Sequence, residues 1–365
     1  MQQARVSAER WKRYPSMKNI TRIHHFISVP LIALAFSLSV ASQAQVRYTI
    51  IDLGTLGGHN SSGLAINNRG QVAGWASTKG GVAYHAVLWT GTKITDLGAL
   101  GGSASVSNGV NIHGQVTGYA DLKIEAACHA ALWIGGNAID LGTLGGRFSQ
   151  GKAINDHGQV TGWAAPPQSE FSHAFLYDHA TMRDLGTLGG LESSGNSVNA
   201  NGQVAGDSWL KEDGGRHAFR YDRKGMHDLG TLGGTMSAGL SINASGQIAG
   251  EASTKDDAAY HAVRWKGAKI TDLSASGGSD SVGCGINRFG VVVGCFTVKE
   301  KLSHAFIAPA NTMVDLNTLL PSHSGWELTA ASSINDSGWI TGQGKFNGQD
   351  RAYLLKPIGS APARR

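Results

Sequence analysis

The sequence predicts an all-β fold, a seven-bladed β-propeller of four-stranded blades, and three observations support this prediction. One unit of about 44 residues recurs seven times along the chain. Each unit contains two short hairpins and shows no helical periodicity. Glycine supplies 51 of the 365 residues, well above an average share of roughly 7%, as regularly spaced tight turns require.

Three sequence marks recur at a spacing of 44 residues, and only the last steps of each series depart from it, by one to four residues. An Asp-Leu pair begins at Asp52, Asp96, Asp140, Asp184, Asp228, Asp272 and Asp315. An asparagine with a glycine three residues later recurs at Asn67, Asn111, Asn155, Asn199, Asn243, Asn287 and Asn335. A His-Ala pair begins at His85, His129, His173, His217, His261 and His304, and the seventh slot holds Arg351. Because three independent marks share one period, the repeat sets the number of structural units.

Each unit predicts four short strands. The Asn-x-x-Gly tetrad, such as residues 67–70, suits a type I turn, which favours Asn first and Gly fourth. The apolar segments 64–66 and 71–73 flank that turn and form the first hairpin. A second hairpin joins residues 85–89 to residues 93–97. Four strands in about 44 residues is the size of one propeller blade.

The two ends of the repeat region complement each other. Residues 47–52 are half of a His-Ala hairpin without its partner, and residues 351–355 are the missing half. Pairing these N- and C-terminal strands would close the ring. An open β-solenoid is the alternative, but it needs distinct polar caps, and none is visible. We assign residues 45–356 to the propeller and residues 357–365 to a flexible C-terminal tail.

A histidine and an aspartate eleven residues apart should face each other across the second hairpin. The spacing recurs as His85/Asp96, His129/Asp140, His173/Asp184, His217/Asp228 and His261/Asp272. An active site or metal site needs side chains that converge on one point, whereas pairs repeated in every blade are typical of structural hydrogen bonds. We therefore predict structural pairs, with no catalytic residue, metal or cofactor. In the closing blade, Arg351 would face Asp52 and replace the imidazole as donor.

In three units phenylalanine extends the His-Ala pair, giving His173-Ala174-Phe175, His217-Ala218-Phe219 and His304-Ala305-Phe306. Together with the other marks, these triplets resemble the HAF-repeat family of extracellular repeat proteins. The resemblance covers nearly the whole chain after residue 44. It implies export and a repeat architecture, and it implies no reaction. The sixth and seventh units depart from the pattern after their Asp-Leu pairs, so we expect the ring to be irregular there.

The N-terminal segment has the layout of a secretory signal peptide. Two cations, an apolar run over residues 26–40 and the small residues Ala41-Ser42-Gln43-Ala44 follow Met17, the expected start. A membrane anchor is the alternative, but an apolar run of about 15 residues is short for a bilayer. We predict a signal peptide over residues 1–44, a secreted or periplasmic location, and no integral membrane segment after cleavage.

The positive charge of the chain is concentrated in this segment. The formal net charge is +5, but residues 1–44 hold six of the 31 cations and one of the 26 anions. The remaining 25 cations and 25 anions balance. No basic stripe is left to contact a phosphate backbone, which argues against nucleic-acid binding.

Function is expected where the units differ. One position on the second strand changes from aromatic to acidic along the chain, as Trp75, Tyr119, Trp163, Asp207 and Glu251. If this position rims the ring, aromatic faces beside carboxylates suit a sugar or a cationic ligand. The alternative is packing between blades for the aromatic side chains and a solvated strand end for the acids.

The loop before each His-Ala pair also varies, and all seven loops should share one face, as binding loops of repeat proteins do. We therefore expect a monomeric, non-catalytic protein that binds an unknown ligand, a glycan or a protein, through one face. Two alternatives stay open. One is a glycan-cleaving hydrolase or lyase that uses Asp207 and Glu251, and the other is a structural surface or adhesin component. Cys284 and Cys295 flank one predicted hairpin and could pair in an oxidising compartment.

Overall fold

The computed structural model describes residues 47–123, 127–211, 214–274, 280–299 and 302–359. The chain divides into two compact units, residues 1–44 and 45–365. The predicted signal peptide and its start at Met17 lie outside the described residues, all of which belong to the second unit. Within the described ranges, no helix is long and apolar enough to cross a membrane.

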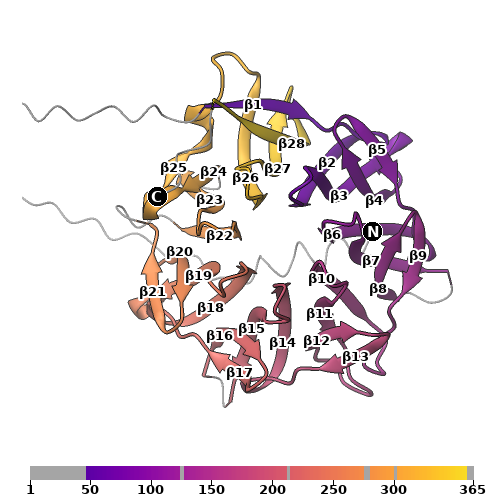
Figure 1. Ribbon diagram of the computed structural model, residues 1–365, viewed down its shortest axis with the longest axis vertical. Helices are drawn as coiled ribbons and strands as arrows, with labels where there is room; N and C mark the ends of the chain where they lie inside the picture. Colours follow the sequence, from indigo (N-terminus) through magenta and orange to yellow (C-terminus); the bar gives the residue numbers. More distant parts are fainter. Residues whose placement is uncertain (1–46, 124–126, 212–213, 275–279, 300–301, 360–365) are drawn as a thin grey trace, which may run out of the picture. The chain divides into compact units, whose positions relative to one another are not determined.

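The strands follow one another as antiparallel meanders of four, and each meander is called a blade below (Figure 1). Blade 1 contains β2 (Gly57–Ile66), β3 (Gln71–Thr78), β4 (Tyr84–Thr90) and β5 (Lys93–Asp96). Blade 2 contains β6 (Gly101–Val110), β7 (Val116–Leu122), β8 (Cys128–Ile134) and β9 (Asn137–Asp140). Blade 3 contains β10 (Ser149–Ile154), β11 (Val160–Ala164), β12 (His173–Asp178) and β13 (Thr181–Asp184). Blade 4 contains β14 (Gly189–Val198), β15 (Val204–Leu210), β16 (Arg216–Asp222) and β17 (Gly225–Asp228).

The remaining blades follow the same plan. Blade 5 contains β18 (Gly233–Ile242), β19 (Ile248–Thr254), β20 (Tyr260–Lys266) and β21 (Lys269–Asp272). Blade 6 contains β22 (Ser281–Ile286), β23 (Val292–Lys299), β24 (Leu302–Ala308) and β25 (Val314–Asp315). Blade 7 contains β26 (Trp326–Ile334), β27 (Ile340–Phe346), β28 (Gln349–Ile358) and β1 (Arg47–Asp52). Short 3₁₀ turns occur at η1 (Lys79–Gly81), η2 (Lys255–Asp257), η3 (Pro309–Asn311) and η4 (Leu316–Leu319).

The ring closes through the two ends of the described chain. Strand β1 pairs antiparallel with β28, from Arg47 opposite Ile358 to Asp52 opposite Tyr353. The propeller therefore extends two residues beyond its predicted end at residue 356, because Arg47 and Tyr48 give Ile358 and Pro357 strand partners. The predicted tail is thus shorter than residues 357–365, and its last six residues lie outside the described part of the chain.

The first strand of each blade is innermost and contacts the first strands of both neighbouring blades (Figure 1). Asparagine side chains link these strands at the first turn. Each asparagine donates its Nδ2 hydrogen to the main-chain oxygen of the next asparagine, over 2.8 to 3.3 Å. The series runs through Asn67, Asn111, Asn155, Asn199, Asn243, Asn287 and Asn335, and then returns to Asn67. These bonds explain why the asparagine mark is present in every unit.

Each blade buries one large aromatic ring from its third strand, and all seven rings are less than 2% exposed: Trp89, Trp133, Phe175, Phe219, Trp265, Phe306 and Tyr353. The ring packs over the glycine of the second strand. At Gly250, an added Cβ would lie 1.9 Å from the carbonyl oxygen of Ala238 and 3.1 Å from the ring of Trp265. Glycine is therefore required there for the strands and the ring to pack together.

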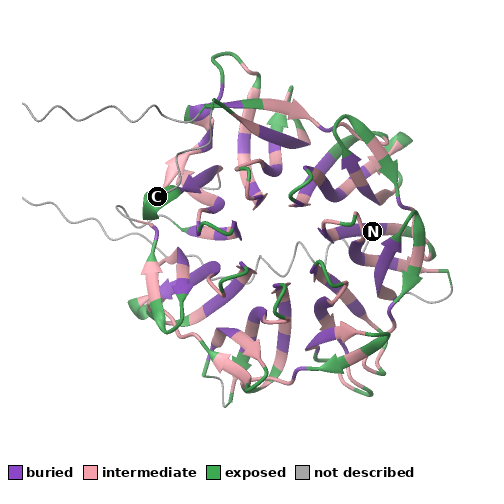
Figure 2. Cartoon of the chain, viewed as in Figure 1, coloured by how far each residue is buried: buried purple, intermediate pink, exposed green. Residues whose placement is uncertain are grey.

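Neighbouring blades are joined by buried serines. A serine on each of six first strands accepts a hydrogen bond of 2.8 to 3.0 Å from the alanine N–H of the preceding His-Ala or Arg-Ala pair. The serines are Ser61, Ser105, Ser149, Ser193, Ser237 and Ser281. Burial is concentrated on the inner strands, whereas the outermost strands of blades 1, 2 and 3 are largely exposed (Figure 2). Residues able to meet a ligand are therefore at the strand ends and the rim.

Candidate functional site

The predicted His–Asp pairs lie at the outer edge of the blades. In five of them the histidine Nδ1 is 2.7 to 2.9 Å from an aspartate oxygen: His85–Asp96, His129–Asp140, His173–Asp184, His217–Asp228 and His261–Asp272. A sixth pair, His304–Asp315, has the same geometry at 2.7 Å. This pair was not among the five predicted, although His304 and Asp315 carry the same two marks at the same spacing of eleven residues, and the sequence pattern could have revealed it.

Each aspartate also holds the start of the crossover to the next blade. In blade 1, Asp96 accepts a hydrogen bond of 2.8 Å from the N–H of Gly98. In blade 7, Arg351 Nη2 lies 3.2 Å from Asp52 Oδ2, and Asp52 accepts a bond of 2.9 Å from Gly54. The pairs repeat around the ring with the same partners, an arrangement suited to holding strands together rather than to one reaction centre.

The five residues predicted to bind a ligand are divided between two blade interfaces and a separate position. Trp75 packs edge-on against Tyr84 at a centroid distance of 5.9 Å, and the hydroxyl groups of Tyr84 and of Tyr119 in blade 2 affect each other's pKa. Burial raises the pKa of both tyrosines above the usual value. Trp163 lies on β11, opposite Gln150 and Ala174.

The two predicted acids meet around an arginine between blades 4 and 5. Asp207 accepts a hydrogen bond of 2.8 Å from Asn196 and lies 3.4 Å from Arg216 Nη1. Glu251 is 8% exposed. Burial raises its pKa from 4.5 to about 7; the charge of Arg216 lowers that pKa, and the charges of Asp207 and Asp280 raise it. The carboxyl of Glu251 therefore changes its protonation state near neutral pH.

The two neighbouring cysteines of blade 6 are both free thiols. A hydrogen bond to Cys295, together with burial, raises the pKa of Cys284, and the same bond lowers the pKa of Cys295. Burial also raises the pKa of the third free thiol, Cys128. Cys284 and Cys295 thus lie side by side, as their positions around one hairpin predicted, and no disulfide joins them in this structure.

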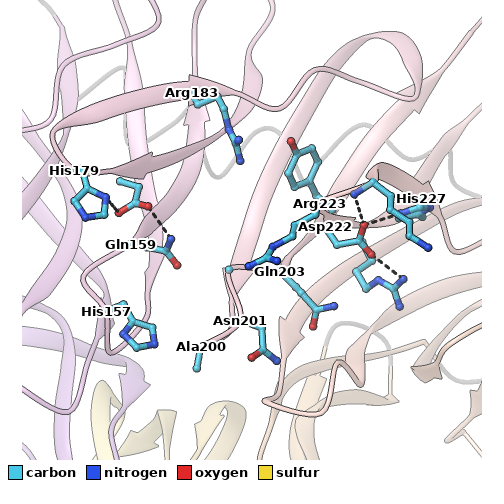
Figure 3. A pocket seen from close by; sticks show the side chains of 15 residues that line it. His157, Gln159, His179, Arg183, Ala200, Asn201, Gln203, Asp222, Arg223 and His227 are labelled. Atoms are coloured by element: carbon cyan, nitrogen blue, oxygen red, sulfur yellow. Dashed lines mark hydrogen bonds and ion pairs between the residues drawn. The ribbon is translucent and has the colours of Figure 1, made fainter.

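A cavity of about 1230 Å³ lies between blades 3 and 4, at the end of the blades where both hairpins turn (Figure 3). We call this end the turn face. The first-hairpin turns contribute His157 and residues 200–202, and also Gln159 and Gln203, which directly precede β11 and β15. The second hairpins contribute Asp178, His179, Arg183, Arg220, Tyr221, Asp222, Arg223, Lys224 and His227. None of these residues was a predicted site residue.

The two carboxylates of the cavity are occupied by neighbouring donors. Asp178 accepts a hydrogen bond from Gln159 Nε2 at 3.0 Å and is paired with His179 Nδ1 at 2.8 Å. Asp222 is bonded by the Lys224 main chain at 2.9 Å, by His227 Nε2 at 3.0 Å and by Arg220 Nη2 at 3.1 Å (Figure 3). Burial acts to raise the pKa of Asp222, but these hydrogen bonds and charges lower it overall.

The cationic side chains outnumber the carboxylates. The lining holds three arginines and one lysine against two aspartates, in addition to three histidines. The Arg183 guanidinium lies 5.6 Å from the centroid of the Tyr221 ring. Within the described residues, the side chains of Arg183, Arg223 and Lys224 have no hydrogen bond or ion pair. The cavity therefore offers unneutralised positive charge to solvent.

These residues stand at positions where the repeat changes from unit to unit. Asp178 and Asp222 occupy a slot that other units fill with Thr90, Ile134 and Lys266. Arg183 and His227 occupy a slot that other units fill with Thr95, Ile139, Thr271 and Val314. Comparison of the units at the second-hairpin turn thus held the signal for this cavity, whereas the positions nominated from the sequence lie on the second strand and in the loops of the opposite face.

No family model and no curated protein sequence matches this chain. Among solved structures, it is similar to TolB from Acinetobacter baumannii, at 12% identity and a TM-score of 0.46, over 80% of this chain and 64% of that chain. The chain thus spans less than two thirds of the length of TolB. It is also similar to the gluconolactonase XC5397 from Xanthomonas campestris, at 10% identity and a TM-score of 0.40, over 87% of this chain and 96% of that chain.

A third solved structure supports the fold. The β-propeller domain of the trilobed protease from Pyrococcus furiosus has 6% identity and a TM-score of 0.54, over 81% of this chain and 93% of that domain. That domain is described as having an open velcro topology, whereas in this chain β1 pairs with β28. The likeness, together with the strand order, confirms that the chain folds as an all-β propeller.

Proposed function

We propose that this chain is an exported, non-catalytic protein of the HAF-repeat kind, which binds a ligand through the turn face of blades 3 and 4. The cavity of about 1230 Å³ is the observation on which the proposal depends. Its lining combines cations that make no hydrogen bond or ion pair with described residues and side chains that the other units lack. Export is supported by the signal-peptide layout of residues 1–44 and by the resemblance of the repeat marks.

The turn face is favoured over the position first nominated from the sequence. Trp75 and Tyr119 contact neighbouring aromatic side chains, and Asp207 is engaged by Asn196 and Arg216. Side chains that already contact each other have fewer free hydrogen-bond donors and acceptors for a ligand than the guanidinium groups of Arg183 and Arg223 have. Ligand sites are typically concave and contain a few convergent polar groups, as this cavity does.

Thermal-shift and glycan-array screening of the purified protein tests the proposal. We expect at least one ligand whose binding is lost in the double variant Arg183→Ala/Arg223→Ala and kept in Trp75→Ala. A ligand lost only in Trp75→Ala would move the site to the blade 1–2 interface. Silence across the panel, with a folded protein that self-associates at micromolar concentration, would instead favour a structural surface component.

A glycan-cleaving hydrolase or lyase is the second candidate, and the pair Asp207 and Glu251 favours it. One carboxylate is ion-paired, while burial raises the pKa of the other to about 7, and such a difference suits a base and an acid. A reducing-end assay on polysaccharides decides between the candidates. Activity that Glu251→Gln abolishes would establish an enzyme, and absence of activity across the panel would leave the binding protein.

A further inference from the structure

Arg183 and Arg223, whose side chains make no hydrogen bond or ion pair with described residues, contrast with an arginine at the same face of blade 5. Arg264 is bound by protein on both sides, with Nη1 2.7 Å from the carbonyl of Gly290 and Nη2 2.6 Å from Asn311. Arg264 is therefore part of the scaffold. Arg183 and Arg223 extend into the open space of the cavity and make no comparable bond to described residues (Figure 3).

The charge of the cavity selects an anion. Asp178 already has one hydrogen bond and one ion pair and Asp222 has three hydrogen bonds, so these carboxylates offer little to a cationic ligand. Guanidinium groups bind carboxylate, sulfate and phosphate groups through paired hydrogen bonds. Because the chain after residue 44 has no net charge, this attraction is local to the cavity.

The size and polarity of the cavity indicate an extended ligand rich in hydroxyl groups. Its volume of about 1230 Å³ exceeds that of a typical site for one small molecule, roughly 300–1,000 Å³. Amides line it beside the cations: Gln203 receives a bond from Asn199 on Oε1, which leaves its Nε2 hydrogens without a partner among the described residues. Such amides donate to and accept from sugar hydroxyls.

From these observations we propose that the cavity binds an acidic oligosaccharide, with Arg183 and Arg223 contacting its carboxylate or sulfate groups. The inference rests on the proposed function and specifies its ligand. A peptide is less suited, because peptide recognition commonly uses an open sheet edge or an apolar groove, and the lining of this cavity is mostly polar. Single-stranded nucleic acid needs free aromatic faces, whereas Arg183 already covers the Tyr221 ring.

Isothermal titration of the purified protein tests the inference. The probes are a galacturonic acid tetramer, a sulfated tetrasaccharide, a neutral galactose tetramer and a hexaglutamate peptide. We expect one or both acidic sugars to bind, the neutral tetramer not to bind, and affinity to fall with added salt. Arg183→Ala/Arg223→Ala should weaken binding at least about tenfold, the loss predicted for one charge-assisted hydrogen bond. The carboxylated and sulfated probes distinguish the two sources of charge.

The matched control is Lys266→Ala/Lys269→Ala, which removes two exposed cations from the corresponding hairpin of blade 5. It should leave binding unchanged, and circular dichroism should show both double variants folded. Tighter binding of hexaglutamate than of either acidic sugar would overturn the inference in favour of a protein partner. Loss of a neutral glycan in the arginine variant would overturn the inference but keep the proposed function. No binding by any probe or screened ligand would overturn both.

Discussion

Blade 5 and blade 7 make the same set of interactions from very different stretches of chain. In blade 5 all four strands are consecutive, and His261 meets Asp272 at 2.7 Å. In blade 7 the outer strand comes from the start of the described chain, and Arg351 meets Asp52 at 3.2 Å. In both, a buried serine accepts a bond from the alanine that follows the donor residue, at 2.9 Å in blade 5 and 3.0 Å in blade 7.

The comparison teaches that the blade tolerates a change of residue at two of its positions, the donor to the aspartate and the buried ring, while the strand glycine and the linking serine and asparagine are kept. Trp265 and Tyr353 fill the same place over a strand glycine, although Trp265 is the fifth residue counted from its histidine and Tyr353 is the third counted from Arg351. The difference is that blade 7 also holds the two ends together. Variants at matched positions separate these two roles.

The largest effect is expected from removal of the buried ring. Trp265→Ala and Tyr353→Ala should each lower the free energy of unfolding by about 3–5 kcal/mol, because each leaves a cavity in a fully packed blade. Urea denaturation measures this loss. Tyr353→Ala should in addition release β1 to limited proteolysis, since the same strand, β28, holds β1 in place. Equal protease resistance of β1 in the two variants would contradict a special role for blade 7.

A smaller effect is expected from the acid that blade 5 has where blade 7 has Gln343. Burial raises the pKa of Glu251 from 4.5 to about 7, so the folded protein binds this proton more tightly than the unfolded chain does. The free energy of unfolding should therefore fall as the pH rises from about 4.5 to about 8, by at most about 3 kcal/mol. Glu251→Gln should flatten this part of the profile, as thermal melts between pH 5 and 8 would show.

Exposed Asp256 provides the control for this experiment, because Asp256→Asn changes a carboxyl of the same blade that solvent already surrounds. That variant should keep the pH profile of the parent protein. If Glu251→Gln also kept it, the burial of the Glu251 carboxyl would not be coupled to stability.

The smallest effect is expected at the outer edge. Arg351→Ala should cost about 1 kcal/mol or less, because the ion pair with Asp52 is partly exposed, at 20% and 27%. It should also increase cleavage near β1, whereas His261→Ala in blade 5 should not. Arg351→His, which restores the residue of the other blades, should recover the loss. Unchanged melting temperature and protease resistance in Arg351→Ala would show that this pair does not hold the ring closed.

Much of the fold could be predicted because the same turn and strand residues recur from unit to unit. The spacing of Asp96 after His85 predicted that the two side chains would meet across the second hairpin, and the half-hairpin at residues 47–52 predicted its partner strand. The alternative placements of the buried ring could not be predicted, since Val87 with Trp89 and Phe175 with Tyr177 have similar hydrophobic patterns. Only the packed structure shows that one ring per blade occupies the site.

The candidate site was predicted less well, for a physical reason. Trp75 and Asp207 vary between units because they face partners that vary too, so the variation there follows packing. Arg183 and Asp222 also vary between units, but not to match a varying partner. That they line one cavity depends on how blades 3 and 4 pack against each other. A repeat predicts the contacts that recur in every unit, such as those of the asparagines and serines, far better than contacts between side chains that differ from unit to unit.

The asparagine series has a consequence for how such a chain can change length. Each unit of about 44 residues is one structural blade, so a change in chain length by one unit would add or delete one blade. A deletion that left the ring open would leave one buried amide and one buried carbonyl without a partner, a penalty of roughly 1–3 kcal/mol for each group. The asparagine series thus stabilises only a ring in which the last unit meets the first, and a chain with a number of units that cannot close would be less stable.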